Sequence, residues 1–252
     1  ISSTKTEIDF KGNELLIHRV LSSLYRGGYD EVKIMFEKPS EFEIIQSTLN
    51  QELIGFEIIE EGKKHIVVKQ VTNIERSEFQ SMLKRTFTFL LNTADECLDA
   101  LKSNNTDTLK NLVFRDITIN KLTDYCRRAV NKKESYFKHV GPGYAIIELL
   151  EKISDGYRDL CKYASKNKII ASRLVIETLS EINSLLRDTY KLFYNFSLDD
   201  MENFLAKKEK IDNSIKNLSN NIRKSNVEIL LYLSNITNTI FYLNGPLIVN
   251  GL

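Results

Sequence analysis

The pattern of apolar and polar positions changes about seventy residues into the chain. Before that point, short apolar runs alternate with polar ones, and the last two runs flank Glu61-Gly62 with the spacing of a β-hairpin. The pattern predicts a helix, a strand, a helix and two strands, at 13–26, 31–36, 41–51, 55–60 and 64–70. We therefore expect residues 1–73 to form a small α/β domain.

From residue 74 onward, apolar residues recur every three to four positions, which is the period of an α-helix. Six long helices are predicted, at 77–102, 106–131, 143–165, 168–195, 198–223 and 225–243. Polar or glycine-containing stretches at 103–105, 141–143 and 195–197 separate helices, and Asn244-Gly245-Pro246 ends the sixth. Because long helices with short links pack as antiparallel bundles, we expect a mainly α protein whose second domain spans 74–252.

The six predicted helices fall into two sets of three. In each set a long first helix precedes a second with a polar face, and the third is apolar with a few polar positions. This order indicates a weak internal repeat, with copies at about 74–166 and 167–245. Chance similarity between amphipathic helices explains it equally well.

Composition narrows the function classes. The 35 basic and 34 acidic side chains give a net charge of +1, so the chain lacks a broad surface for neutralising nucleic-acid phosphates. No apolar run approaches the roughly 18 residues that a membrane span needs.

The three cysteines, Cys97, Cys126 and Cys161, are an odd number and lie far apart in the sequence, which favours a reducing cytoplasmic setting. Because the first residue is Ile, we expect further residues upstream.

Acidic residues form a stripe on the third predicted helix. Glu151, Asp155 and Asp159 are spaced i, i+4, i+8, so their carboxylates lie on one face at roughly 6 Å per turn. Like charges at this spacing repel one another. A bound cation, a basic neighbour or solvent must offset that repulsion, and hard cations or iron bind carboxylate oxygens readily.

A second stripe lies on the preceding helix, where Asp116, Asn120 and Asp124 have the same spacing. Two neighbouring helices with such stripes are able to hold a multi-carboxylate metal site. The alternative is a solvated face whose acids form local salt bridges with Arg115, Lys121, Lys152 and Arg158. Asp95 and Asp99 on the first long helix form one more acidic pair, with the same alternative.

The sequence offers little for catalysis. It contains no G-x-S-x-G, no phosphate-binding loop and no dinucleotide glycine motif. His18, His65 and His139 share no spacing that indicates a ligand set. The three cysteines stand at helix-periodic apolar positions, which is typical of core residues. No hydrolase constellation can be assembled from these residues.

Three segments resemble one family. The sequence L-E-K-I-S-D at 150–155 is similar to the L-E-R-I-G-D stretch of PhoU phosphate uptake regulators, and D-I-T-I-N-K-L at 116–122 is similar to their D-x-x-(V/I)-D-x-L stretch. The segment L-I-G-F-E-I-I-E-E at 53–61 looks like a strand of archaeal PhoU-like proteins. In those proteins an AbrB-type DNA-binding module precedes a small α/β domain and a PhoU domain of two three-helix repeats. This chain would contain the last two parts.

The resemblance implies a cytoplasmic, non-enzymatic regulator of phosphate uptake and phosphate homeostasis. Family members dock on the phosphate ABC transporter ATPase or on a sensor kinase, and for this chain we expect a homodimer without membrane insertion. Contact with DNA would come only through the upstream module. The resemblance also implies a carboxylate-bound divalent or iron-type metal ion. Its ligands would be Asp116, Glu151 and Asp155, with Asn120 where the family has Asp.

The second copy departs further from the family pattern. Lys208 stands at its first acidic position, Asp212 keeps the second, and S-N-I-T-N at 234–238 replaces the E-R-I-x-D motif. Because lysine and amides bind hard cations poorly, we expect at most one metal site, in the first copy. Two other functions stay open: a carboxylate-bundle metalloenzyme, which would need a histidine near the stripes, and a purely structural dimerisation module.

Overall fold

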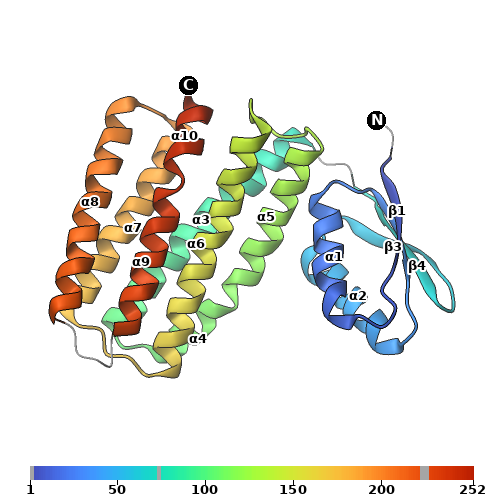
Figure 1. Cartoon of the computed structure of the whole chain (residues 1–252), viewed down its shortest axis with the longest axis horizontal. Helices are drawn as coiled ribbons and strands as arrows, with labels where there is room; N and C mark the ends of the chain where they lie inside the picture. The colour runs from blue at the N-terminus through green and yellow to red at the C-terminus, as the bar shows by residue number, and fades with distance from the viewer. Residues whose placement is uncertain (1–2, 73–74, 222–226) are drawn as a thin grey trace. The chain divides into compact units, whose positions relative to one another are not determined.

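The computed structural model describes residues 3–72, 75–221 and 227–252 (Figure 1). Its backbone forms two compact units, one of residues 1–83 with 120–136 and the other of residues 84–119 with 137–252. The units therefore differ from the contiguous domains expected at 1–73 and 74–252. The difference comes from α5 (Arg115–Asn131), whose residues from Asn120 onward belong to the first unit.

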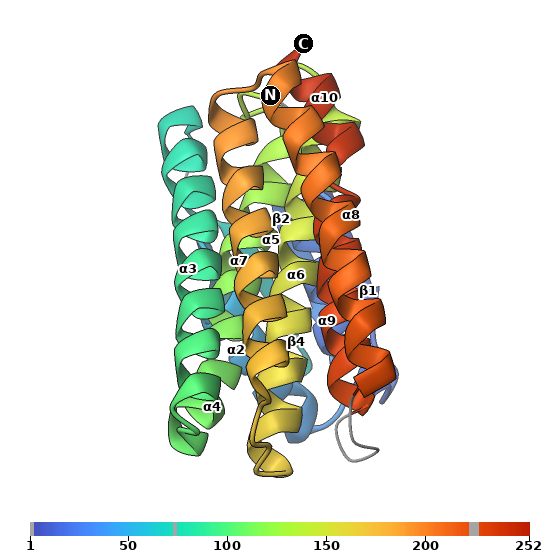
Figure 2. The same ribbon diagram turned by 90° about the vertical axis from the view of Figure 1, so that its left-hand side faces the viewer.

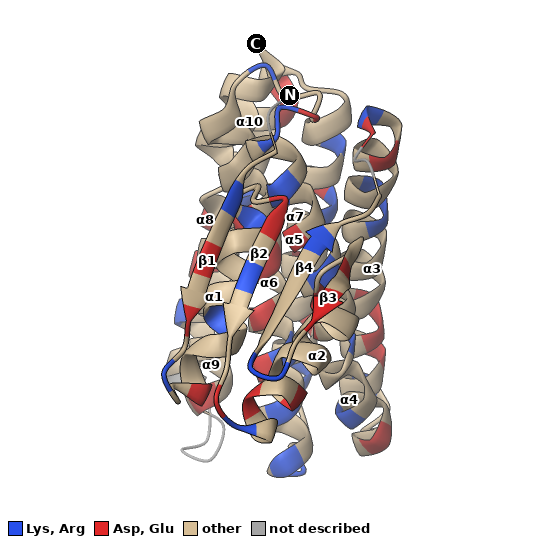
Figure 3. Cartoon of the chain, turned by 90° about the vertical axis from the view of Figure 1, so that its right-hand side faces the viewer, with Lys and Arg blue, Asp and Glu red and all other residues tan. Residues whose placement is uncertain are grey.

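The first unit contains a four-stranded sheet of order β1-β2-β4-β3. Its strands are β1 (Lys5–Asp9), β2 (Glu31–Met35), β3 (Phe56–Glu61) and β4 (His65–Gln70). β1 pairs in parallel with β2, and β4 is antiparallel to both β2 and β3. Two helices, α1 (Glu14–Arg26) and α2 (Pro39–Glu52), lie behind the sheet in Figure 3.

The first strand, β1, was not among the elements predicted from the sequence. β1 has the sequence K-T-E-I-D, and every second side chain along it is exposed. It is an edge strand with a single strongly apolar residue, Ile8, so it lacks the alternating apolar signal of a half-buried strand. Pairing with β2, which hydrophobic periodicity does not report, makes it a strand.

The two faces of the sheet have opposite character. One face packs against α1 and α2 through residues that are at most 2% exposed: Ile17, Leu21, Tyr25, Val32, Ile34, Ile45, Ile66 and Val68. On the other face, Lys5 contacts Glu31 at 2.8 Å and Lys33 contacts Glu7 at 3.3 Å. This division is typical of a sheet with one solvated face, and such exposed ion pairs contribute little stability.

Arg128 joins α5 to the rest of the first unit. Its fully buried guanidinium donates hydrogen bonds to the carbonyl oxygens of Tyr25 (2.8 Å) and Tyr29 (2.7 Å) and to the Asp30 carboxylate (2.8 Å). Lys132 Nζ lies 2.7 Å from the same carboxylate. A cation beside the last carbonyls of α1 is favourable, since those carbonyls carry the negative end of the helix dipole.

The second unit is helical. It contains α4 (Thr106–Val113), α6 (Val140–Lys166), α7 (Arg173–Tyr194), α8 (Leu198–Asn221), α9 (Val227–Phe241), α10 (Asn244–Gly251) and α3 (Arg76–Lys102) from residue 84 onward. Within it, α3, α6, α7, α8 and α9 run side by side (Figure 2). The expected fold class, a small α/β region followed by a helical domain, is confirmed. None of the helices in the described ranges is long and apolar enough to cross a membrane.

Several predicted helix ends were wrong. The helix expected at 106–131 is divided into α4 and α5 at Phe114, whose side chain is 68% exposed. The stretch 141–143, expected to separate two helices, forms the first turn of α6. Pro246, expected beyond a helix end, stands in the first turn of α10. Proline is tolerated in a first turn, where its missing N–H group has no helical partner to lose.

α6 and α9 approach each other closely at Gly156. A Cβ atom at this position would lie 2.7 Å from Cγ1 of Ile236, so only glycine permits the observed packing. Ile236 and the flanking Ile153 and Tyr157 are fully buried. The third helices of the two expected copies thus pack directly against each other.

Candidate functional site

The two predicted acidic stripes meet at Asp116. This residue begins α5, and its carboxylate is buried, with 6% of the residue exposed. It accepts hydrogen bonds from Ser154 Oγ (2.8 Å) and Arg158 Nη1 (2.7 Å), both on α6. The free N–H groups of a first helical turn also favour a carboxylate there. The segments that resemble PhoU motifs are therefore in contact.

Arg158 is the shared cation of this cluster. Its Nη1 lies 2.5 Å from Asp155 Oδ1, and its Nη2 lies 3.0 Å from Asp159 Oδ1. Burial acts to lower the pKa of Arg158, but hydrogen bonding to Asp116 and the charges of Asp116 and Asp155 outweigh it and raise the pKa above its usual value. A permanently charged guanidinium therefore offsets the repulsion within the acidic stripe.

Glu151 lies one turn before Asp155, with 13% of its side chain exposed. Lys152 Nζ lies 3.8 Å from Glu151 Oε1 and 3.0 Å from Asp155 Oδ2. Lys152 and Arg158 thus form the local salt bridges that were the alternative to a metal site. Arg115 pairs elsewhere, since both of its Nη atoms lie 2.7 Å from the Glu96 carboxylate.

The stripe of Asp116, Asn120 and Asp124 does not act as one group. Asn120 and Asp124 belong to the first unit, whereas Asp116 belongs to the second. The Asp124 carboxylate pairs with Arg127 (2.7 Å) and Arg26 (3.5 Å). Burial raises the pKa of Asp124 in spite of these two cations.

A metal ion does not fit these side chains in their present positions. Within the described ranges, no group of three or more His, Cys, Asp or Glu side chains is close enough to hold one. Arg158 binds oxygens of both Asp116 and Asp155, and a dication would compete with it for those atoms. Metal binding by Asp116, Asn120, Glu151 and Asp155 stays a prediction.

The corresponding part of the second copy is built differently. Lys208 on α8 forms an ion pair with Asp212, and its Nζ lies 5.0 Å from the centre of the Phe241 ring. On α9, Asn238 Nδ2 lies 3.4 Å from Ser234 Oγ. A lysine therefore occupies the region where the family pattern has an acid.

A buried polar connection joins three helices of the second unit. Tyr157 on α6 donates a hydrogen bond to Asn183 Oδ1 on α7 (2.7 Å), and Asn183 Nδ2 donates to the Ala94 carbonyl on α3 (2.7 Å). Tyr157 and Asn183 are at most 1% exposed. Sequence reasoning missed this pair, although an asparagine within the apolar stripe of a helix is a detectable signal.

The cysteines are structural. All three are buried, and within the described residues none forms a disulfide. A hydrogen bond with Cys161, together with burial, raises the pKa of Cys97 well above its usual value. Since the thiolate is the reactive form, Cys97 is a poor nucleophile, as its position in the sequence predicted.

Comparisons with known proteins give one likeness. No family model matches the chain, and no curated protein matches it. Among solved structures, the chain is similar to a protein of Shewanella oneidensis MR-1 described as a PhoU-like phosphate regulatory protein. The identity is 9% and the TM-score 0.44, over 68% of this chain and 97% of that chain. A likeness at this level carries no argument about function.

Proposed function

We propose that the protein is a non-enzymatic regulator of phosphate uptake and phosphate homeostasis, which acts in the cytoplasm by binding other proteins. The observation that carries the proposal is the contact between Asp116 and the Ser154–Arg158 segment. These two segments resemble the paired motifs of PhoU regulators, and they touch across α5 and α6 in this chain. The contact brings the two motif-like segments together, as a site shared by two paired motifs requires.

The chemistry of the cluster favours a structural role over a catalytic one. Its carboxylates accept hydrogen bonds from Arg158, Lys152 and Ser154. A general base or nucleophile needs a free lone pair directed at a substrate, and these oxygens are directed at internal partners instead. The cluster therefore stabilises the junction of α5 and α6.

The proposed partners are the phosphate ABC transporter ATPase and a sensor kinase of phosphate signalling. The direct test is co-purification of the full chain with each of these proteins from its own organism, with an ATPase of an unrelated ABC transporter as the matched control. We expect retention by a phosphate-system partner and not by the control. Equal retention by all three, or by none, contradicts the proposal.

A strain that lacks the gene provides a second, independent readout. We expect its phosphate uptake under phosphate-replete conditions to differ from that of the parent, and complementation to restore it. Unchanged uptake, combined with a stable homodimer that retains no partner, would favour the purely structural dimerisation module.

Metal binding is a separate part of the proposal. Elemental analysis of the purified chain and of a Glu151→Ala, Asp155→Ala variant tests it directly. Lower metal content in the variant supports a site in the first copy. Equal content in both proteins, or none in the parent, contradicts it. A metalloenzyme would in addition show turnover that depends on added iron or manganese.

A further inference from the structure

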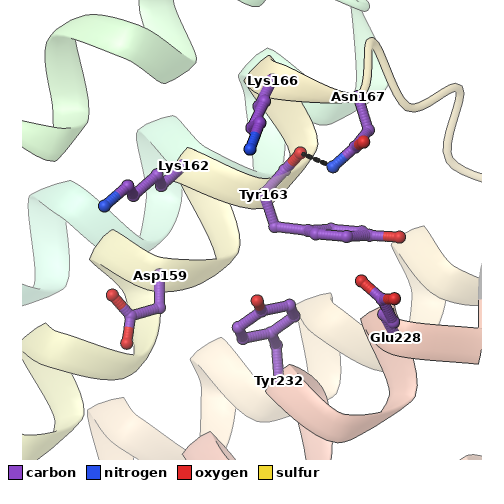
Figure 4. Close-up of a pocket in the computed structure, with 7 residues that line it drawn as sticks. All are labelled: Asp159, Lys162, Tyr163, Lys166, Asn167, Glu228 and Tyr232. Carbon is purple, nitrogen blue, oxygen red and sulfur yellow. Dashed lines mark hydrogen bonds between the residues drawn. The ribbon is translucent and has the colours of Figure 1, made fainter.

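A pocket of about 490 Å³ lies between the end of α6 and the start of α9 (Figure 4). It is lined by Asp159, Lys162, Tyr163, Lys166, Asn167, Glu228 and Tyr232. This volume lies within the range of roughly 300–1,000 Å³ that is typical of small-molecule sites. The lining residues form one-turn pairs that face each other, with Lys162 and Lys166 on α6 and Glu228 and Tyr232 on α9.

The pocket contains two acids as well as two lysines. Asp159 pairs with Arg158 at 3.0 Å. Burial, together with the charge of Glu228, raises the pKa of Tyr163. By contrast, Lys162 and Lys166 form no ion pair with any side chain in the described ranges, and both are exposed. The two lysines are therefore the groups of the pocket that can bind an anion.

The pocket has two chemically different ends. Figure 4 shows Lys162 and Lys166 on one side and Glu228 on the other, with the Tyr163 and Tyr232 rings close to Glu228. The ring centroids are 5.3 Å apart and the planes are inclined by 38°, so the two tyrosines form one aromatic surface. A ligand that fits needs an anionic group at one end and an aromatic ring with hydrogen-bond donors at the other.

We propose that this pocket binds a nucleoside monophosphate. Its phosphate contacts the ammonium groups of Lys162 and Lys166, whose Cβ atoms lie roughly 6 Å apart on successive turns, so that both side chains can reach one phosphate. Its base lies against Tyr232, and an amino group of the base or a sugar hydroxyl donates to Glu228. This inference does not depend on the regulatory function proposed above.

Titration calorimetry of the full chain with AMP, adenosine and inorganic phosphate tests the proposal. We expect AMP to bind more tightly than either part alone, because only AMP engages both ends. In a Lys162→Gln, Lys166→Gln variant, the Kd for AMP should rise about tenfold through loss of charge-assisted hydrogen bonds. Tyr232→Ala should also raise it about tenfold, since base stacking contributes about 1–3 kcal/mol, and Tyr232→Phe should restore the affinity.

The matched control variant loses the same number of positive charges at positions outside the pocket. Lys138→Gln with Lys210→Gln removes two exposed lysines that do not line it, and AMP affinity should stay close to that of the parent. Three results would overturn the proposal: no heat with millimolar AMP, equal weakening by the pocket and control variants, or inorganic phosphate that binds as tightly as AMP. Thermal unfolding of each variant verifies that it is folded.

Discussion

The helices of the two predicted copies neutralise their charged positions in different ways. In the first copy, the α6 residue Arg158 serves Asp116, Asp155 and Asp159, and one of these acids is nearly fully buried. In the second, the α8 residue Lys208 pairs with Asp212, with 47% of that side chain exposed, and also lies over the Phe241 ring. The comparison shows that one cation of the fold offsets the repulsion among several acids in the first predicted copy.

The largest expected effect comes from removing that cation. Arg158→Met leaves Asp116 buried without its main counter-charge, which should lower the free energy of unfolding by about 3 kcal/mol. The matched variant Lys208→Met breaks a more exposed pair and should cost at most about 1 kcal/mol. Urea unfolding monitored by circular dichroism measures both, and equal losses would mean that the copies do not differ in this respect.

The next largest effect concerns the buried hydrogen bonds of Asn183, which join α3, α6 and α7. Asn183→Ala removes the acceptor for the Tyr157 hydroxyl and the donor to the Ala94 carbonyl, so stability should fall by about 2 kcal/mol. Tyr157→Phe removes only one of the two hydrogen bonds and should cost about 1 kcal/mol. If chemical denaturation finds Tyr157→Phe as damaging as Asn183→Ala, the Ala94 bond contributes nothing.

The close approach of α6 and α9 provides a steric test of similar size. Gly156→Ala places a methyl group against Ile236 and should destabilise the fold by about 1–2 kcal/mol. Gly141→Ala is the control, because no atom lies within 4 Å of the added carbon. Thermal melts should show a lower Tm for the first variant only, and a neutral Gly156→Ala would show that the helices can separate without cost.

The smallest effect concerns the first unit, where Arg128 and Lys132 hold Asp30. Burial acts to raise the pKa of Asp30, but hydrogen bonds and charges from these cations and the Thr4 amide lower it below the usual value of 3.8. A depressed carboxyl pKa contributes stability above about pH 4 that is lost as the pH falls through the folded-state pKa.

Asp30→Asn should therefore cost about 1 kcal/mol at pH 7 and less at pH 3, because the contribution of the carboxylate decreases as the pH falls toward its folded-state pKa. Unfolding free energies of parent and variant at both pH values provide the measurement. A difference that is independent of pH would mean that Asp30 acts by packing and not by its charge.

The acidic stripe and its need for a counter-charge followed directly from helical spacing. Glu151, Asp155 and Asp159 had to share a face, and a cation, a basic neighbour or solvent had to compensate them. The choice of a basic neighbour depended on the direction of the Arg158 side chain. That direction is set by packing between α5 and α6, which spacing along one helix does not encode.

The missed features share a physical cause, because each depends on groups that are distant in sequence. β1 becomes a strand by pairing with β2, and the Asn183 hydrogen bonds join three helices. The pocket beside Tyr163 and Tyr232 exists because the end of α6 meets the start of α9. Periodicity reports what one segment buries, and it does not report which partner covers it.

The assignment of residues 120–136 to the first unit has a consequence for how this protein can evolve or be divided. Neither unit is a continuous stretch of sequence, so recombination at a single point cannot transfer one of them intact. Division of the chain near residue 73 would separate Arg128 from Tyr25, Tyr29 and Asp30. These three residues accept the hydrogen bonds of its guanidinium group. A fragment that ends near residue 73 would therefore lack part of the first unit.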